Sequence, residues 1–340
     1  MAGRQVRLPA SPRRIVLLEA RDMVTLSLLH PDPASRVAGW AAADRVDSAL
    51  LQSRFERNGR IPEVGKQTPE SVSLEGILSL APDLVVASDY MAAQGDGSSL
   101  VTRLARVGVP VVIGDAANNS VQLAATGPLA TLHRYLRMWG DILDAQDRAT
   151  AFAEFVDARL ARLAQRLEGV TPVVTYLEVQ STLDDCCWAA GQRVWGELLA
   201  LAGGQTLPGV RAPWFQKLQP DALMTAAHEV YIASGGAWVS GGRPPIGPGL
   251  APDAGRAALR RLASRPGFAN LPSVRQHRVH GIWTGLITMA PLNLLFVEIA
   301  AKWLHPDRLA GLDPSQTLAD INRWFRFAPV DGPLWVSLKE

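Results

Sequence analysis

The most regular pattern of apolar positions lies in the middle of the chain, between Pro128 and Glu168, where glycine and proline are nearly absent. Apolar residues recur there at steps of three and four, which predicts two amphipathic helices. The first set is Leu129, Leu132, Leu136, Trp139 and Leu143, and the second is Phe152, Phe155, Val156, Leu160, Leu163 and Leu167. We interpret the segment as a connector between two lobes, although a surface helix pair inside one domain would give the same pattern.

Polar residues from Asp144 to Asp147 interrupt this pattern. We expect Asp147 to be the N-cap of the second helix and Gly169 to follow its end. A helix from Asp147 to Glu168 would be roughly 33 Å long, at about 1.5 Å per residue. That length is sufficient to join two lobes along one side.

On both sides of the connector, short continuous apolar runs alternate with helical patterns. Strands are expected at 14–18, 36–40, 64–65, 84–87, 109–113, 173–177, 230–233 and 278–283. Helices are expected from Met23 to Leu29 and at 74–80, 99–107, 195–201, 220–227, 254–262 and 291–304. Such alternation favours parallel sheets covered on both faces.

The predicted fold is therefore α/β, with two Rossmann-like lobes that have mainly parallel sheets and are joined by a long connector helix. The first lobe spans residues 1–127, the connector helices 128–168 and the second lobe 169–340. Residues 241–252 are expected to form a loop, and the tail from 329 onward has no clear period.

The composition of the chain mainly excludes certain classes of protein. With 340 residues the chain is long enough for two domains, and its net charge of +2, with basic residues scattered along the chain, gives no case for nucleic acid. No apolar run of about 18 residues predicts a membrane span. No signal peptide precedes the first predicted strand, so we expect either a cytoplasmic protein or a mature form whose leader has been removed.

The two cysteines, Cys186 and Cys187, are adjacent. This spacing suits neither a zinc site nor a disulfide that closes a loop, and a disulfide between neighbours would be strained. We expect inert thiols, with a vicinal disulfide as the alternative.

Four stretches carry a family resemblance. They are Val64-Gly65 with 73–86, residues 195–204, Leu271 to Arg275 with Arg278-Val279, and Ala300 to Pro306. Together they resemble the substrate-binding proteins of iron-siderophore, haem and vitamin B12 ABC importers, the class III type with a helical backbone. The resemblance implies a monomeric periplasmic protein, with its leader removed, that holds a ligand between two lobes and delivers it to a membrane permease. One stiff helical connector would allow only modest lobe closure.

The ligand crevice of an open parallel sheet lies beyond the carboxyl ends of its strands. Residues that follow the predicted strands are therefore the candidate ligand-binding residues. They are Glu19, Arg21, Trp40, Ser88, Tyr90, Glu178, Gln180, Trp238 and Trp283. Tryptophan would provide flat contact area and arginine would pair with an anionic chelate. We assign Trp40, Trp238 and Trp283 to the cleft, expect core packing for Trp139, Trp195, Trp303 and Trp324, and leave Trp188 and Trp214 open.

Two acidic residues are candidates for permease docking, because the vitamin B12 relatives use one on each lobe. Glu75 matches the first, and Asp221 stands near the place where a glutamate is usual, with one extra residue of spacing. Both lie at helix N-termini, where a carboxylate is favourable for the helix dipole alone.

The predicted function is capture of a metal chelate, with a ferric siderophore favoured and haem, cobalamin or another metallophore as alternatives. We expect no catalysis, no resident cofactor and no direct metal ligand, because the stretch after Trp283 is apolar and no tyrosine or histidine stands in a ligating motif. An enzyme would need a phosphate loop, a nucleophile elbow or paired histidines, and none is found. A two-lobed metallocluster enzyme would need several dispersed cysteines.

Overall fold

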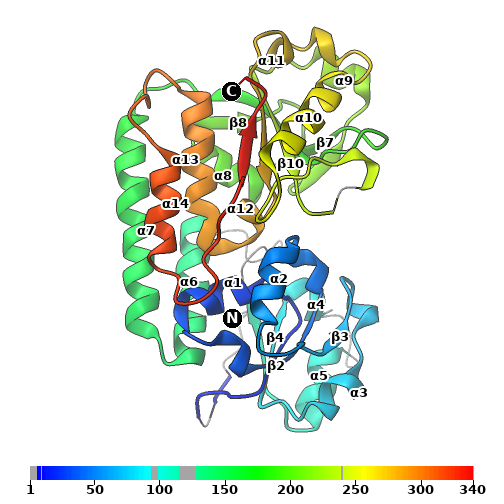
Figure 1. Cartoon of the computed structure of the whole chain (residues 1–340), viewed down its shortest axis with the longest axis vertical. Helices are drawn as coiled ribbons and strands as arrows, with labels where there is room; N and C mark the ends of the chain where they lie inside the picture. Colours follow the sequence, from blue (N-terminus) through cyan, green and yellow to red (C-terminus); the bar gives the residue numbers. More distant parts are fainter. Residues whose placement is uncertain (1–5, 9, 93–98, 115–126, 239, 340) are drawn as a thin grey trace.

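Two α/β lobes lie one above the other, with long helices along one side, in the computed structural model of the chain (Figure 1). The structure describes residues 6–8, 10–92, 99–114, 127–238 and 240–339. The predicted lobe boundary at residue 127 therefore borders residues 115–126, which lie outside the described part. No described helix has both the length and the apolar character that a bilayer crossing requires.

The first lobe contains a five-stranded parallel sheet with the strand order β3-β2-β1-β4-β5. Its strands are β1 (Ile15–Leu17), β2 (Val37–Ala41), β3 (Glu63–Gly65), β4 (Leu84–Ser88) and β5 (Val111–Gly114). Its helices are α1 (Asp22–Leu29), α2 (Ala49–Phe55), α3 (Leu74–Ser79), α4 (Asp89–Ala92) and α5 (Leu100–Arg106). The chain winds outward in both directions from β1, so the strand order reverses between β1 and β4, where α/β sheets place their ligands.

Both faces of this sheet are buried, which explains the continuous apolar strands. Ile15 and Leu17 join one core, whereas Val16 and Leu18 join another on the opposite face. Successive side chains of a strand point to opposite faces, so each apolar run contributes to two cores at once.

The connector consists of α6 (Gly127–Leu143) and α7 (Gln146–Arg166), which pack against each other. The predicted break is present, but the predicted cap is wrong: Ala145 is the N-cap of α7 and Asp147 lies in its first turn. Asp144 has a φ of 53°, and the N–H of Ala145 bonds to the carbonyl of Gly140 at 2.8 Å, so the chain turns before Asp147. After α7, Gly169 has a φ of 74°.

The second lobe contains a seven-stranded mixed sheet. Its strands are β6 (Val173–Gln180), β7 (Trp188–Ala190), β8 (Gly204–Thr206), β9 (Phe215–Lys217), β10 (Val230–Gly235), β11 (Val279–Trp283) and β12 (Trp335–Ser337). Its helices are α8 (Trp195–Leu201), α9 (Pro220–Thr225), α10 (Pro252–Ala263), α11 (Pro272–Arg275), α12 (Gly285–Thr288), α13 (Asn293–Leu304) and α14 (Pro314–Asn322). The central order β8-β6-β10-β11 is parallel, as expected for the predicted strands β6, β10 and β11, although β8 was not predicted. β7, β9 and β12 pair antiparallel at the edges.

A buried polar network fastens α7 to the second lobe. The Arg159 guanidinium donates to both carboxylate oxygens of Glu298 on α13, at 2.9 and 2.7 Å, and to Asp320 on α14 at 3.0 Å. Glu298 is only 2% exposed. Because both partners are charged and mostly removed from water, loss of the arginine would leave a buried carboxylate without its counter-charge.

We expect Arg159→Leu to lower the free energy of unfolding by about 3 kcal/mol, because Glu298 would be left unpaired. Urea unfolding at neutral pH measures the change. Arg162→Leu is the matched control, since Arg162 is exposed one turn further along α7. Equal destabilisation by both substitutions would contradict this role of the network.

Candidate functional site

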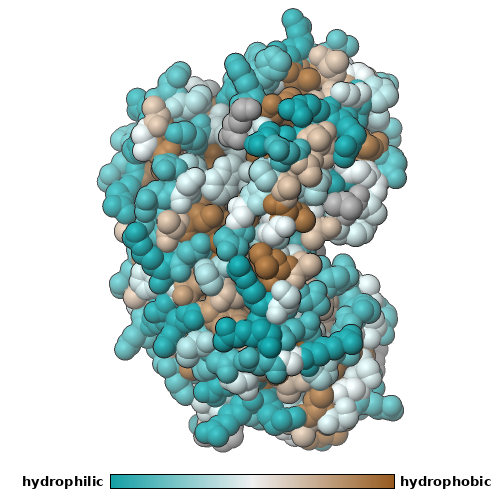
Figure 2. Space-filling view, in the orientation of Figure 1, coloured by the Kyte–Doolittle hydropathy of each residue, from teal (hydrophilic) through white to brown (hydrophobic). Residues whose placement is uncertain are grey.

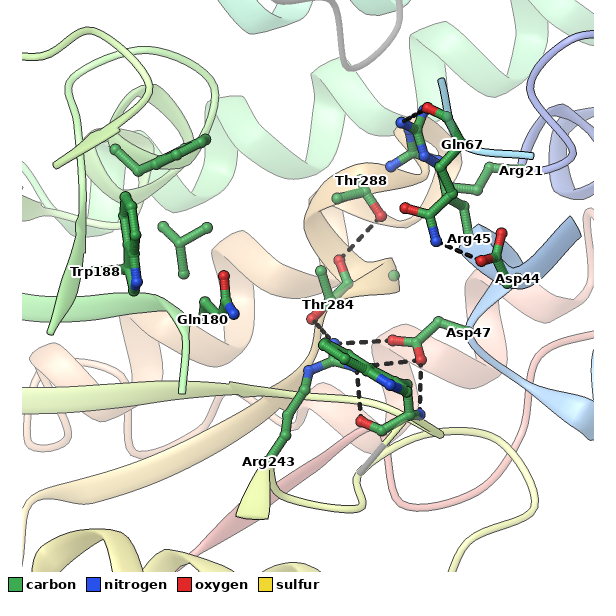
Figure 3. Close-up of a pocket in the computed structure, with 14 residues that line it drawn as sticks. Arg21, Asp44, Arg45, Asp47, Gln67, Gln180, Trp188, Arg243, Thr284 and Thr288 are labelled. Carbon is green, nitrogen blue, oxygen red and sulfur yellow. Dashed lines mark hydrogen bonds and ion pairs between the residues drawn. The ribbon is translucent and has the colours of Figure 1, made fainter. Parts of the chain in front are cut away.

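A cavity of about 650 Å³ lies between the two lobes. Its lining residues are Arg21, Asp44, Arg45, Asp47 and Gln67 from the first lobe and Val179, Gln180, Trp188, Phe215, Trp238, Arg243, Thr284, Gly285 and Thr288 from the second. Figure 2 shows the surface hollowed between the lobes, on the side away from α7. In Figure 3, Arg21 and Arg45 lie across the drawn space from Trp188 and Gln180.

The wall formed by the first lobe is built around one buried carboxylate. Glu19, directly after β1, accepts from Arg21 at 2.9 and 2.7 Å and from Arg45 at 2.8 Å. Burial alone would raise the pKa of Glu19, but Arg21 and then Arg45 hold it below its ordinary value. Two guanidinium groups thus share one carboxylate, which leaves this trio with one net positive charge. Asp44, exposed nearby, accepts from the Gln67 amide.

A second carboxylate, Asp22, lies behind Arg21 and is also buried. The Tyr135 hydroxyl on α6 donates to it at 2.6 Å. Burial raises the pKa of Asp22 to about 7, the Tyr135 hydrogen bond opposes this change, and the neighbouring charge of Glu19 adds to it. Asp22 therefore links α1 to the connector and does not face the cavity.

The wall formed by the second lobe is aromatic. The rings of Trp188 on β7 and Phe215 on β9 meet edge to face, with centroids 5.7 Å apart. The Trp188 indole N–H donates to Asp185 at 3.1 Å, and the ammonium of Lys217 lies 5.7 Å from the Trp188 ring centroid. Trp238 adds a third ring and is 58% exposed. Exposed aromatic faces that line a cavity offer flat contact area for a ligand.

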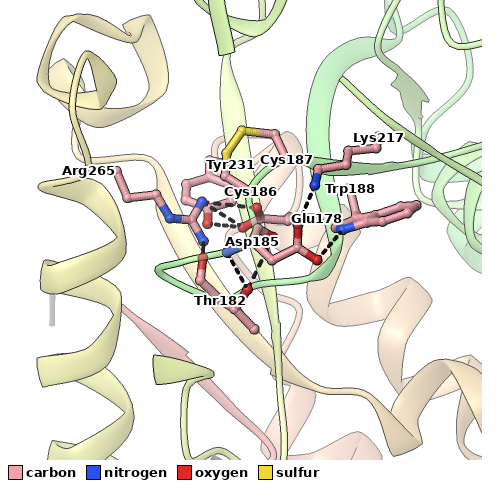
Figure 4. The surroundings of a disulfide bond; sticks show 9 residues. All are labelled: Glu178, Thr182, Asp185, Cys186, Cys187, Trp188, Lys217, Tyr231 and Arg265. Atoms are coloured by element: carbon pink, nitrogen blue, oxygen red, sulfur yellow. Dashed lines mark hydrogen bonds and ion pairs between the residues drawn. A yellow bond between two sulfur atoms is a disulfide. The ribbon is translucent and has the colours of Figure 1, made fainter. Parts of the chain in front are cut away.

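Cys186 and Cys187, directly before Trp188, form a disulfide, so the expectation of free thiols is wrong in this structure (Figure 4). Their sulfur atoms and a carboxylate oxygen of Glu178 lie within 4.8 Å of one another. Disulfide sulfurs are not the thiolates that bind metals, and Glu178 is already paired with Arg265 at 2.9 Å and hydrogen bonded by Tyr231.

The structure distributes the predicted ligand-binding residues over several places. Arg21, Gln180 and Trp238 line the cavity, and Glu19 holds two arginines of its wall. Tyr90 is exposed and lies under Arg45, whose guanidinium is 5.6 Å from the ring centroid. The Ser88 hydroxyl accepts from the N–H of Met91 at the start of α4.

Three predicted residues are buried away from the lining. Glu178 is 0% exposed and is held by Arg265, so it supports the β6 end instead of facing a ligand. Trp40 and Trp283 are 1% and 0% exposed, and both belong to the core. Our assignment of these two indoles to the cleft is therefore wrong, because both are buried in the core and neither lines the cavity.

The candidate docking residues are both exposed. Glu75 lies in the first turn of α3 and Asp221 in the first turn of α9. The two helices stand at the far ends of the two lobes, on the side of the molecule away from α7 (Figure 1). Both residues are therefore exposed on helices that stand on the side away from α7.

Sequence reasoning missed several lining residues. Arg45 and Asp47 follow β2 by a few residues, and Arg243 lies in the predicted loop after β10. Extending the strand-end rule further into these loops would have included all three. Trp188 and Phe215 lie on short edge strands whose sequences show no alternation, so nothing in the pattern identifies them.

Comparison with known proteins places the chain in a family. The model of the periplasmic binding protein family matches residues 29–282. A search of curated protein sequences finds no match. The chain resembles the crystal structure of the TroA-like periplasmic binding protein FepB from Veillonella parvula, at 19% identity and a TM-score of 0.83, covering 99% of this chain and 98% of that one.

Two other solved structures share the fold. A periplasmic heme binding protein from Pseudomonas aeruginosa matches at 20% identity and a TM-score of 0.63, over 96% of this chain and 98% of that one. An ABC-type Fe3+-hydroxamate transport system from Saccharomonospora viridis matches at 19% identity and a TM-score of 0.62, over 89% and 97%. At these identities the structural likeness supports the fold alone.

The fold and the interlobe cavity define a two-lobed solute-binding protein with a helical connector, as the sequence resemblance implied. The family model matches most of this chain, so the chain belongs to the periplasmic binding protein family, whose members serve ABC transporters.

We expect the stability of the protein to fall as the pH rises from about 4 to about 7, through the contribution of Asp22. The pKa of Asp22 is higher in the folded protein, at about 7, than its ordinary value of 3.8, so the folded state binds the proton more tightly in this window. Each pH unit would then cost about 1.4 kcal/mol, and the effect levels off above pH 7.

Asp22→Asn removes this titration, so the free energy of unfolding of the variant minus that of the wild type should increase with pH. Urea unfolding of both proteins at several pH values between 4 and 8 measures the difference. A difference that stays constant with pH would show that Asp22 does not titrate in this range.

Proposed function

We propose that this chain is the substrate-binding component of an ABC importer and that it captures an anionic metal chelate, with a ferric siderophore as the favoured ligand. One observation carries the proposal: two arginines that share a single carboxylate face a wall of exposed aromatic rings across the interlobe cavity. The guanidinium groups suit carboxylate or catecholate oxygens, and the rings suit the flat organic shell of a chelate.

The cavity favours recognition of a pre-formed complex over ligation of bare metal. Its described lining residues include no histidine, tyrosine, cysteine or methionine, and Asp47 is engaged by Arg243. The ligand would therefore be bound through its organic groups. We propose a binding role alone, in a monomer that acts in the periplasm.

Haem is the second candidate, because a porphyrin is flat and carries carboxylates, and a periplasmic heme binding protein shares this fold. A porphyrin would place its flat face on the aromatic wall and its carboxylates near Arg21 and Arg45. Against it, the described lining offers no tyrosine or histidine for the iron. Cobalamin and other metallophores remain further alternatives with the same requirement for aromatic surface.

The experiment is a titration of intrinsic tryptophan fluorescence with a ferric catecholate, a ferric hydroxamate and a ferric carboxylate siderophore, haemin and cobalamin, each against its metal-free form. Trp188 and Trp238 are the expected reporters, in place of Trp40 and Trp283, which are in the core. Saturable quenching by one ferric siderophore supports the proposal, and a response to haemin alone would replace the siderophore by haem.

Arg21→Ala and Arg45→Ala should each weaken binding of the quenching chelate by about tenfold or more, because each removes charge-assisted hydrogen bonds. Arg162→Ala on the outer face of α7 is the control and should leave the affinity unchanged. Unchanged affinity in both cavity variants, with a folded far-UV spectrum, would rule out this wall as the ligand-binding surface.

Glu75 and Asp221 are proposed to contact the permease, because both are exposed on helices that stand on the side away from α7. We expect Glu75→Lys and Asp221→Lys to reduce uptake of the chelate by cells at least about tenfold through charge repulsion, with unchanged chelate affinity. Glu154→Lys, on the opposite side on α7, is the control. Normal uptake by the double variant would exclude these two residues from docking.

A further inference from the structure

The two lobes meet a second time, at the cavity and away from the connector. The contact joins the segment before α2 in the first lobe to the loop that follows β10 in the second (Figure 3). Asp47 is its centre. The Asp47 carboxylate accepts from both terminal nitrogens of Arg243, at 3.2 and 2.9 Å, and from the backbone N–H groups of Ala237 and Trp238, at 2.9 and 3.2 Å.

The Asp47 carbonyl and the Ser48 side chain add two more interlobe bonds. The Trp283 indole N–H donates to the Asp47 carbonyl at 3.2 Å, and the Ser48 hydroxyl donates to the carbonyl of Pro248 at 3.2 Å. Gly236 allows the close approach, because a Cβ there would overlap the Asp47 carboxylate and the Arg243 guanidinium. The two surfaces are therefore fitted to each other in shape as well as in charge.

The Arg243 side chain is also held by hydrogen bonds within its own lobe, the second. It donates to the Gly235 carbonyl at 2.8 Å and to the Thr284 hydroxyl at 2.6 Å. The side chains of Arg243 and Asp47 are 9% and 13% exposed. A guanidinium held in place and largely shielded from water forms a much stronger pair than a solvated one, because water and salt compete little.

We propose that Asp47 clasps the two lobes together at the cavity, through the Arg243 guanidinium and the backbone N–H groups of Ala237 and Trp238. α7 fixes the lobes along one side, so opening of the cleft must break the contacts of Asp47. The clasp thereby sets how often the ligand-free cleft opens to admit or release a ligand. The inference rests on the proposed cleft function for its biological purpose, but its test needs no ligand.

A second interlobe ion pair provides a matched control. Arg54 and Asp331 are joined at 3.1 Å, but their side chains are 31% and 57% exposed. Exposed pairs of this kind contribute little to stability, because solvent screens them. If any loss of interlobe charge loosened the lobes, Asp331→Asn would act like Asp47→Asn, whereas the clasp predicts that it does not.

The Trp283 indole N–H is the reporter, because its donor is in one lobe and its acceptor is a backbone carbonyl of the other. Neither atom is altered in Asp47→Asn or Arg243→Gln. Hydrogen exchange of this group would be followed by NMR in protein with ¹⁵N-labelled tryptophan, without ligand. The buried indole of Trp139 in the connector serves as the internal reference.

We expect exchange at Trp283 to become about tenfold faster or more in Asp47→Asn and in Arg243→Gln, with Asp331→Asn and the Trp139 reference unchanged. Acceleration at both indoles would mean general destabilisation and would overturn the proposal, as would wild-type exchange at Trp283 in both clasp variants. If no chelate binds but exchange at Trp283 is faster in the clasp variants, the proposed function is wrong and the clasp stands. If a chelate binds but exchange at Trp283 is unchanged in these variants, the clasp alone is wrong.

Discussion

Packing of the connector against both lobes is the constraint on which the other features depend. α6 contacts α1 of the first lobe, and α7 contacts α13 of the second. The larger core runs without interruption through both lobes and the two connector helices. Arg159 adds a charged link at a place where slippage of α7 would leave Glu298 buried and unpaired. The walls of the cavity are therefore held at nearly fixed separation, and only small movements remain to admit a ligand.

The arginines of the cavity fall into two electrostatic arrangements. Arg21 and Arg45 compete for Glu19, so their positive charge is only partly neutralised and is available to an anion. Arg243 has Asp47 for itself and is also satisfied by Gly235 and Thr284. The same residue type thus serves recognition on one wall and lobe contact on the other. The ratio of cations to carboxylates, more than the presence of arginine, distinguishes the two roles.

The sequence was most informative where burial is complete. Continuous apolar runs such as Leu84 to Ala87 predicted the parallel strands, because both of their faces must be covered, and the period of three and four predicted the connector helices. The short strands β7, β8, β9 and β12 were missed, since three residues are too few to show a measurable period. Their formation depends on pairing with distant neighbours that a local pattern does not contain.

The candidate site was predictable only near the strand ends. Arg21 and Trp238 follow β1 and β10 by a few residues, Gln180 ends β6, and all three line the cavity. Trp40 and Trp283 also lie near strand ends, but their side chains are buried in the core. The sequence alone does not show which side chains at a strand end face the core and which face the cavity. Asp47 and Arg243 lie in separate loops nearly two hundred residues apart. Their pairing is a tertiary contact, so no spacing along the chain predicts it.

The aromatic wall has a consequence for how such a protein diversifies. Trp188 and Phe215 stand on a short antiparallel pair at the edge of the second sheet, and neither ring belongs to the buried core, many of whose residues lie on β6, β10, β11 and α13. Replacement of either ring would change the shape offered to a ligand while leaving the packed interior intact. Ligand preference can therefore drift, or be redesigned, with little loss of stability. The edge of the sheet is the place where a library for new ligands would begin.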